Sequence, residues 1–163
     1  LERLGTAHRR RTAGSGSPPL RVAFVGTITR NKGCHVLLDA WGLLDPALRK
    51  RARLDIVGST QHDQDYQRDI AQRAGFVGAR LRGALPREQV NAELSELDLL
   101  VVPSTWYENS PLVILEAIAA RTPVLVSNIG GMAELVEDGA SGESFRVGDA
   151  SELAARLARF IEH

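Results

Sequence analysis

Two glutamates, Glu108 and Glu116, have the residue type and the spacing of a pair that binds a hydroxyl-rich ligand. Glu108 lies shortly after the apolar run 99–102, which is typical of a buried parallel strand. Glu116 is the only charge in the apolar run 111–120, which is typical of a helix packed on most of its faces. A carboxylate accepts hydrogen bonds from two neighbouring hydroxyls, as on a ribose or a pyranose. Because ligands of open α/β sheets bind between a strand and the following helix, we expect both acids to face one ligand.

Each glutamate also has a purely structural interpretation. Glu108 is a favourable acid near a helix N-terminus. Glu116 is costly to bury unless a cation pairs with it, and Arg30 or Lys32 is the partner that we consider. We favour the ligand-binding interpretation, most clearly for Glu116, because both acids are aimed at the same crevice.

A basic loop follows the first apolar run, 21–25, which ends in Gly26. The loop carries Arg30 and Lys32 just before an expected helix. Small residues, basic side chains and a helix start together predict an anion site, for example for a diphosphate. The loop has neither the Gly-Lys-Ser/Thr order of a P-loop nor a G-x-G-x-x-G fingerprint. A strand-to-helix turn with solvated bases explains the same residues, so both interpretations stay open at this point.

A third strand-to-helix connection contains Gly130 and Gly131, followed by Glu134. Two glycines permit positive φ and a close backbone approach, although a plain tight turn explains them equally well. Glu134 complements the dipole of the helix expected there. The four histidines show no metal-ligand spacing, and no Asp-x-Asp pair offers a clear divalent-cation site, so we predict no metal site.

Strand and helix signals alternate from residue 20 to the end of the chain. This alternation predicts one α/β domain, 20–163, with a Rossmann-like open, mainly parallel six-stranded sheet and helices on both faces. Residues 1–19, with three consecutive arginines and a stretch rich in Gly, Ser and Pro, predict a flexible linker or the end of a preceding segment. The apolar runs place five strands, at 21–25, 53–57, 79–82, 98–102 and 123–127. The helical patterns cover 32–45, 64–75, 86–96, 111–121, 130–137 and 150–162.

Composition argues against several functional classes. Twenty basic and twenty acidic residues give no net charge, which disfavours a nucleic-acid partner. The single cysteine, Cys34, excludes an internal disulfide and agrees with a reducing, cytoplasmic compartment. No apolar stretch approaches the roughly 18 residues of a membrane span. The chain starts without methionine, which we interpret as a fragment of a longer protein.

Several ordered motifs make the sequence similar to one family. They are 24–26 with 32–33, 55–58, 98–104, the pair Glu108 and Glu116, 130–134, and 138–139 with Gly142. From about Leu20 to His163 the chain resembles the C-terminal, nucleotide-sugar-binding domain of the group 1 (family 4) glycosyltransferases, retaining enzymes of the GT-B fold. The resemblance implies the donor half of a metal-independent hexosyltransferase, with a nucleoside-diphosphate sugar as donor substrate and no further cofactor. It also implies an N-terminal, acceptor-binding domain absent from this chain, and it allows peripheral membrane association of the full-length enzyme.

The same resemblance assigns roles to residues by position. Lys32 contacts the donor diphosphate and Glu108 faces the hydroxyls of the transferred sugar, and we take these two as the catalytic residues. Glu116 holds the ribose hydroxyls, while the backbone around Leu81 and Arg82 flanks the base. The other expected substrate-binding positions are Gly26, Thr27, Arg30, Gly58 and the segment Asn109, Ser110, Pro111 and Leu112, whose backbone N–H groups cradle the sugar and the phosphate.

One position departs from the family pattern. The family often has an arginine directly after the first glycine, where this chain has Thr27, and Arg30 is the candidate to replace it. A GT-B-type nucleotide-sugar epimerase and a non-catalytic nucleotide-sugar-binding module remain as alternatives. A complete donor crevice without a second domain predicts that this chain folds alone, binds a nucleoside diphosphate weakly and transfers no sugar.

Overall fold

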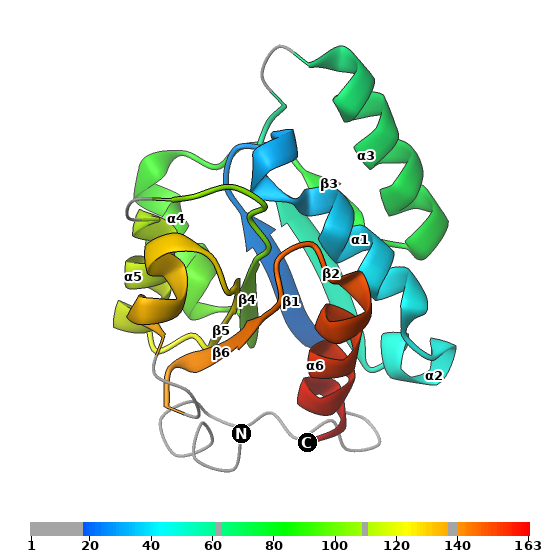
Figure 1. The fold of residues 1–163 in the computed structure, drawn as a ribbon. Coiled ribbons are helices and arrows are strands. Elements are labelled where there is room, and N and C mark those ends of the chain that lie inside the picture. Colours follow the sequence, from blue (N-terminus) through cyan, green and yellow to red (C-terminus); the bar gives the residue numbers. More distant parts are fainter. Residues whose placement is uncertain (1–17, 61–62, 109–110, 137–139) are drawn as a thin grey trace.

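A single open sheet forms the centre of the molecule (Figure 1). The computed structural model describes residues 18–60, 63–108, 111–136 and 140–163. The strands are β1 (Leu20–Val25), β2 (Ala52–Val57), β3 (Arg80–Arg82), β4 (Leu99–Val102), β5 (Val124–Ser127) and β6 (Gly142–Phe145). They form one sheet in the order β3-β2-β1-β4-β5-β6, and each pair of neighbours is parallel. The predicted six-stranded, mainly parallel α/β sheet is confirmed.

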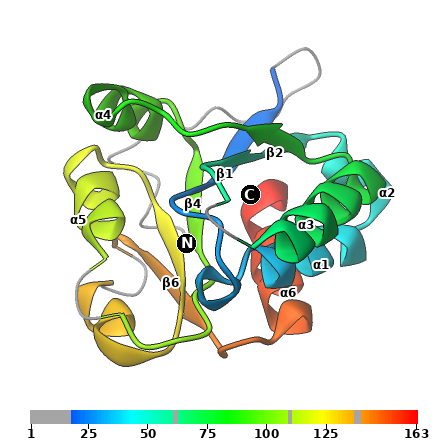
Figure 2. The ribbon, with the colours of Figure 1, turned by 90° about the horizontal axis from the view of Figure 1, so that it is seen from above.

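Helices cover both faces of this sheet (Figure 2). In the described part of the chain they are α1 (Cys34–Leu43), α2 (Pro46–Arg49), α3 (Gln64–Val77), α4 (Arg87–Ser95), α5 (Leu112–Ala119) and α6 (Ala150–Glu162), with 3-10 segments η2 (Arg30–Lys32) and η3 (Gly130–Leu135). On one face α1, α3 and α6 form a core with β1 and β2, which buries Trp41 and Leu157. On the other face α4, α5 and η3 form a core with β4 and β5, which buries Leu94 and Ile114. Strands β4 and β5 are buried at every residue, as expected of central parallel strands.

The strand order reverses between β1 and β4. Strand β1 pairs with β2 on one side and with β4 on the other, where Val22 lies opposite Leu99. The loops that leave β1 and β4 run to helices on opposite faces, and ligands of open α/β sheets bind at such a reversal. We call the loops 26–33 and 103–108, together with α5, the switch-point region. It contains Lys32, Glu108 and Glu116, the charged residues that the sequence analysis assigned to the diphosphate, the sugar and the ribose.

The structure corrects several expected elements. The predicted helix 32–45 is the turn η2 followed by α1, because Gly33 has φ 72° and takes a left-handed conformation between them. The short helix α2 was not predicted; Asp45 caps it by accepting a hydrogen bond from Ala47 N–H. The predicted helix 130–137 is the 3-10 segment η3, and residue 137 lies outside the described residues, as do residues 1–17 of the predicted linker.

Helix α5 lacks the environment expected of it. Ile114 and Ala117 are buried, whereas Leu112 and Leu115 are 64% and 43% exposed, so the expectation of packing on most faces was wrong. The helix packs against β5, α4 and η3, which leaves its outer face open to solvent. Within the described ranges, no helix has the length and apolar character that crossing a membrane requires.

Candidate functional site

Lys32 and Glu108 form an ion pair in the switch-point region. The ammonium nitrogen of Lys32 lies 2.6 Å from Glu108 Oε1 and 2.8 Å from Oε2. The hydroxyl of Ser104, which is fully buried, donates a third hydrogen bond to Oε1 at 3.1 Å. The side chains of Lys32 and Glu108 are 31% and 13% exposed, so the pair is accessible from solvent. The fold therefore brings together the two residues predicted to be catalytic.

Gly33 explains why the two loops can meet. A Cβ atom on Gly33 would lie 1.9 Å from the carbonyl oxygen of Pro103, so only glycine allows this approach. Two residues after Pro103, the amide of Thr105 donates to the carbonyl oxygen of Asn31 at 2.8 Å. These backbone contacts hold the loop after β1 directly against the loop after β4, and they place Lys32 beside Glu108.

Glu116 has a different partner from the ones we considered. Its Oε1 accepts a hydrogen bond from Nη2 of Arg87, the first residue of α4, rather than from Arg30 or Lys32. The side chain of Glu116 is 18% exposed and that of Arg87 is 66% exposed. The carboxylate is thus neutralised by a cation that is itself mostly in solvent, and it stays close to the surface of the switch-point region.

Arg30 points toward α3 instead of toward the Lys32–Glu108 pair. Its Nε donates to Asp63 at 3.0 Å, and its guanidinium carbon lies 4.9 Å from the centre of the Tyr66 ring. It lines a pocket of about 450 Å³, together with Asn31, His35, Tyr66, Asp69, Arg73 and Thr105. Burial and the charge of Arg73 lower the pKa of His35, whose Nδ1 lies 2.9 Å from the Tyr66 hydroxyl.

The predicted base-flanking residues lie at the edge strand β3. Leu81 is 47% exposed. The carbonyl oxygens of Arg82 and Gly83 both lie within reach of the Gly58 amide, at 3.4 and 3.2 Å. The Arg82 side chain pairs with Glu93, and this hydrogen bond raises the pKa of its guanidinium. The Arg82 side chain is thus engaged by Glu93. The role of the backbone around Leu81 and Arg82 beside the base stays a prediction.

The remaining predicted residues divide into three groups. Thr27 is exposed beside Gly26 at the end of β1. Pro111 is buried, whereas Leu112 opens α5 and is mostly exposed. Asn109 and Ser110 lie outside the described residues, so the cradle of backbone N–H groups stays a prediction.

Comparison with known proteins identifies the family. The family model for glycosyl transferases group 1 matches residues 8–163. The chain belongs to this family. It is 36% identical to a glycogen synthase of Mycobacterium tuberculosis H37Rv over 148 residues, covering 88% of the chain and 34% of that protein. It is also 32% identical to the putative colanic acid biosynthesis glycosyltransferase WcaL of Salmonella typhimurium, covering 100% of the chain and 42% of the relative.

Solved structures of glycosyltransferases have the same fold. Anabaena HepE in complex with UDP and glucose superimposes with a TM-score of 0.78 at 28% identity, over 88% of this chain and 39% of that one. A sucrose-phosphate synthase from Thermosynechococcus elongatus gives a TM-score of 0.75 at 28% identity, over 88% of this chain and 36% of that one. The chain thus spans 34% and 42% of the curated relatives named above, and it is the group 1 glycosyltransferase domain shared with them.

Three residues around the site of this glycosyltransferase domain were not among the predicted site residues. Ser104 orients Glu108, and its place two residues after β4 was the available signal. Gly130 lies against Glu108, since a Cβ there would be 3.4 Å from the carbonyl oxygen of Glu108. Arg87 gave no signal, because its partner Glu116 is 29 residues away and on another helix. Among the residues described, no group of three or more His, Cys, Asp and Glu side chains is placed to hold a metal ion.

Proposed function

We propose that this chain is the donor-binding domain of a retaining, metal-independent glycosyltransferase, which moves a sugar from a nucleoside-diphosphate sugar to an acceptor. The observation that carries the proposal is the Lys32–Glu108 pair, held by Ser104 at the reversal of strand order. Anabaena HepE, which has the same fold at 25–28% identity, was crystallised with UDP, with UDP-glucose, and with UDP and glucose. This supports a nucleotide-sugar donor for the present chain.

Lys32 has one donor left for the substrate. An ammonium group has three N–H bonds, and two of them point to the oxygens of Glu108. The third can bind an oxygen of the donor diphosphate. When the bond between the anomeric carbon and the diphosphate breaks, negative charge grows on the leaving group, and a fixed cation stabilises that charge more than it stabilises the ground state.

Glu108 acts at the other end of the breaking bond. Its carboxylate has acceptor sites beyond those used by Lys32 and Ser104, and these can receive hydroxyls of the transferred sugar. The sugar becomes oxocarbenium-like as the leaving group departs, and the carboxylate stabilises the growing positive charge. Retention follows if the acceptor attacks the face from which the diphosphate leaves.

The nucleoside lies further along the switch-point region in this proposal. Glu116 accepts hydrogen bonds from the ribose hydroxyls, and the backbone around Leu81 and Arg82 flanks the base. The acceptor is bound by an N-terminal domain that belongs to the longer protein, so this chain holds half of an active site. The cytoplasmic location and the peripheral membrane association expected from the sequence remain predictions.

The proposal is tested by a turnover assay on the full-length protein. With a panel of UDP-, ADP- and GDP-sugars, we expect one donor to be consumed, through hydrolysis or transfer, with the product retaining the anomeric configuration of the donor. Turnover should persist in the presence of EDTA. Interconversion of donor epimers without release of nucleoside diphosphate would instead identify an epimerase, and the absence of any turnover would identify a binding module.

A further inference from the structure

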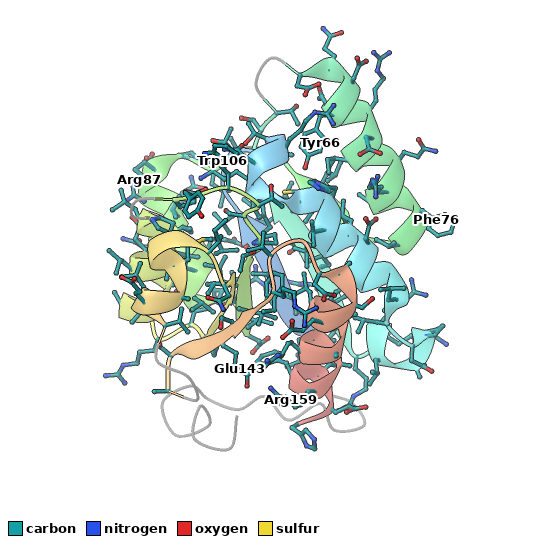
Figure 3. All side chains as sticks on the ribbon, viewed as in Figure 1. Tyr66, Phe76, Arg87, Trp106, Glu143 and Arg159 are labelled. Atoms are coloured by element: carbon teal, nitrogen blue, oxygen red, sulfur yellow. The ribbon has the colours of Figure 1, made fainter. Side chains whose placement is uncertain are left out.

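Arg87 occupies an unusual position for an ion-pair residue. It is the first residue of α4, it reaches Glu116 on α5, and its own side chain remains 66% exposed. Figure 3 shows Arg87 at the same upper end of the molecule as Trp106, which lies in the loop after β4. An ion pair with so exposed a partner contributes little to stability. The position of Arg87 therefore needs another reason.

The charges of the switch-point region leave the donor diphosphate short of cations. Lys32 supplies one positive charge, which Glu108 already shares. Thr27 supplies none, and Arg30 is directed toward α3, where its guanidinium contacts Asp63 and the ring of Tyr66. The side chain of Arg82 is likewise committed to Glu93. A diphosphate ester carries about two negative charges, so one further cation is expected.

Arg87 can supply that cation because of where Glu116 lies. Glu116 is four residues after Leu112, the first residue of α5, so its backbone lies ~6 Å along the helix axis from the start of α5, and Arg87 contacts its carboxylate there. The N-terminus of a helix is where an anion is favoured. A guanidinium has five N–H donors in a planar fork that suits phosphate oxygens, and the pair with Glu116 uses one of them.

We propose that Arg87 is a donor-binding residue whose guanidinium exchanges Glu116 for the donor diphosphate when a nucleotide sugar binds. This inference rests on the proposed function. Ribose hydroxyls replace Arg87 on the carboxylate of Glu116, and the released guanidinium turns toward the diphosphate oxygens. Arg87 thereby provides the positive charge that the family pattern places at Thr27.

The experiment compares a nucleoside with its diphosphate, because only the diphosphate meets Arg87 in this mechanism. NMR titrations of the 163-residue chain would give the Kd of uridine and of UDP for the wild type, Arg87→Ala and Arg87→Lys. We expect Arg87→Ala to raise the Kd of UDP about tenfold or more, because a charge-assisted hydrogen bond to the diphosphate is lost. The Kd of uridine should change less than about threefold. Arg87→Lys should recover part of the UDP affinity, since it restores charge without the fork.

Arg159→Ala is the matched control. Arg159, whose side chain is 47% exposed, also pairs with a glutamate, Glu143, which is 14% exposed. This pair lies at the opposite end of the molecule (Figure 3). Arg159→Ala should leave both Kd values unchanged. Equal losses of affinity for UDP and for uridine in Arg87→Ala, or an unchanged affinity for UDP, would overturn the role of Arg87 while leaving the proposed function standing. A wild-type chain that binds none of UDP, ADP and GDP would instead remove the proposed function, and this inference with it.

Discussion

The ammonium group of Lys32 contacts both carboxylate oxygens of Glu108, at 2.6 and 2.8 Å, although 76 residues separate the two in the sequence. The fold therefore brings the two charges of the candidate site together from distant parts of the chain. A pair held by Ser104 and by the close approach of Gly33 to Pro103 needs little reorganisation when the substrate arrives. Such preorganisation is what makes electrostatic stabilisation of a transition state effective.

Removal of the Lys32 charge should impair turnover. In the full-length enzyme, Lys32→Ala is expected to lower kcat/KM by about 10²-fold or more, as for a lost charge contact in the transition state. Steady-state kinetics with the preferred donor would measure the change. Lys50→Ala is the control, because Lys50 is the other lysine of the chain and lies exposed at the end of α2. A Lys32→Ala enzyme with wild-type kinetics would contradict the role of Lys32.

Removal of the Ser104 hydroxyl should loosen Glu108 without removing a charge. Ser104→Ala deletes one buried hydrogen bond at 3.1 Å, a contribution of about 1 kcal/mol. If that energy is lost from the transition state, kcat of the full-length enzyme should fall roughly 3- to 10-fold, while folding is retained. If Ser104→Ala alters the melting temperature but leaves kcat and KM unchanged, Ser104 is structural only.

Removal of the Glu116 charge should separate ribose binding from stability. Glu116→Gln keeps the shape of the side chain and weakens a charge-assisted hydrogen bond to the ribose, so the free energy of UDP binding should weaken by about 1.5–3 kcal/mol. The free energy of unfolding of the nucleotide-free protein should change by less than about 1 kcal/mol, because Arg87 is largely exposed and water can solvate its guanidinium. Thermal melts with and without UDP would measure both effects. A variant that melts several degrees lower when empty, yet binds UDP normally, would show that Glu116 is only an ion-pair residue.

The pair Asp55–Arg80 should make stability depend on acid pH. Asp55 is buried on β2, where Arg80 holds it with two hydrogen bonds of 2.7 and 2.8 Å. Burial acts to raise the pKa of Asp55, but the hydrogen bonds and charge of Arg80, with Arg53 and Arg82, outweigh it and lower that pKa. A carboxylate with a lowered pKa stabilises the fold above its unfolded pKa, about 3.9, and this stabilisation is lost as the pH falls through the folded value.

Asp55→Asn should therefore lower the free energy of unfolding by about 2 kcal/mol at pH 7. This difference in stability from the wild type should shrink below about pH 4. Urea denaturation at a series of pH values would measure it. Asp65→Asn is the control, since the side chain of Asp65 is 83% exposed and pairs with Arg68 on the same helix. A difference that stays constant down to pH 2 would show that the charge of Asp55 does not matter to stability.

Most of the sheet could be predicted because its strands are apolar runs bounded by glycines and prolines. Strand β6 could not be placed, since its sequence Gly-Glu-Ser-Phe has one large apolar residue and is held by pairing with β5. Gly33 follows η2 and Gly130 begins η3, both with positive φ, and the periodicity of the neighbouring residues does not reveal these conformations. Local pattern predicts elements well and their ends less well.

The candidate site was predictable in part. The loops after β1 and β4 were recognisable as strand-to-helix connections, and the fold shows that Lys32 and Glu108 meet there. The partner of Glu116 was not predictable, because Arg87 approaches it from α4 through tertiary packing. The sequence also could not show that Arg30 is drawn away by Asp63 and Tyr66. Long-range ion pairs depend on the packing of helices, which the sequence pattern leaves open.

The central claim is that the donor diphosphate binds between the loops after β1 and β4. The most direct test is an NMR titration of the isotope-labelled 163-residue chain with UDP-glucose, ADP-glucose and GDP-mannose, following the amide signals and the ammonium signal of Lys32. We predict weak binding of one of them, with the largest changes at Lys32, Gly33, Glu108 and the first turn of α5, and no sugar transfer. Changes centred on the pocket of Arg30, Tyr66 and Arg73, or no change with any of the three nucleotide sugars, would contradict the account.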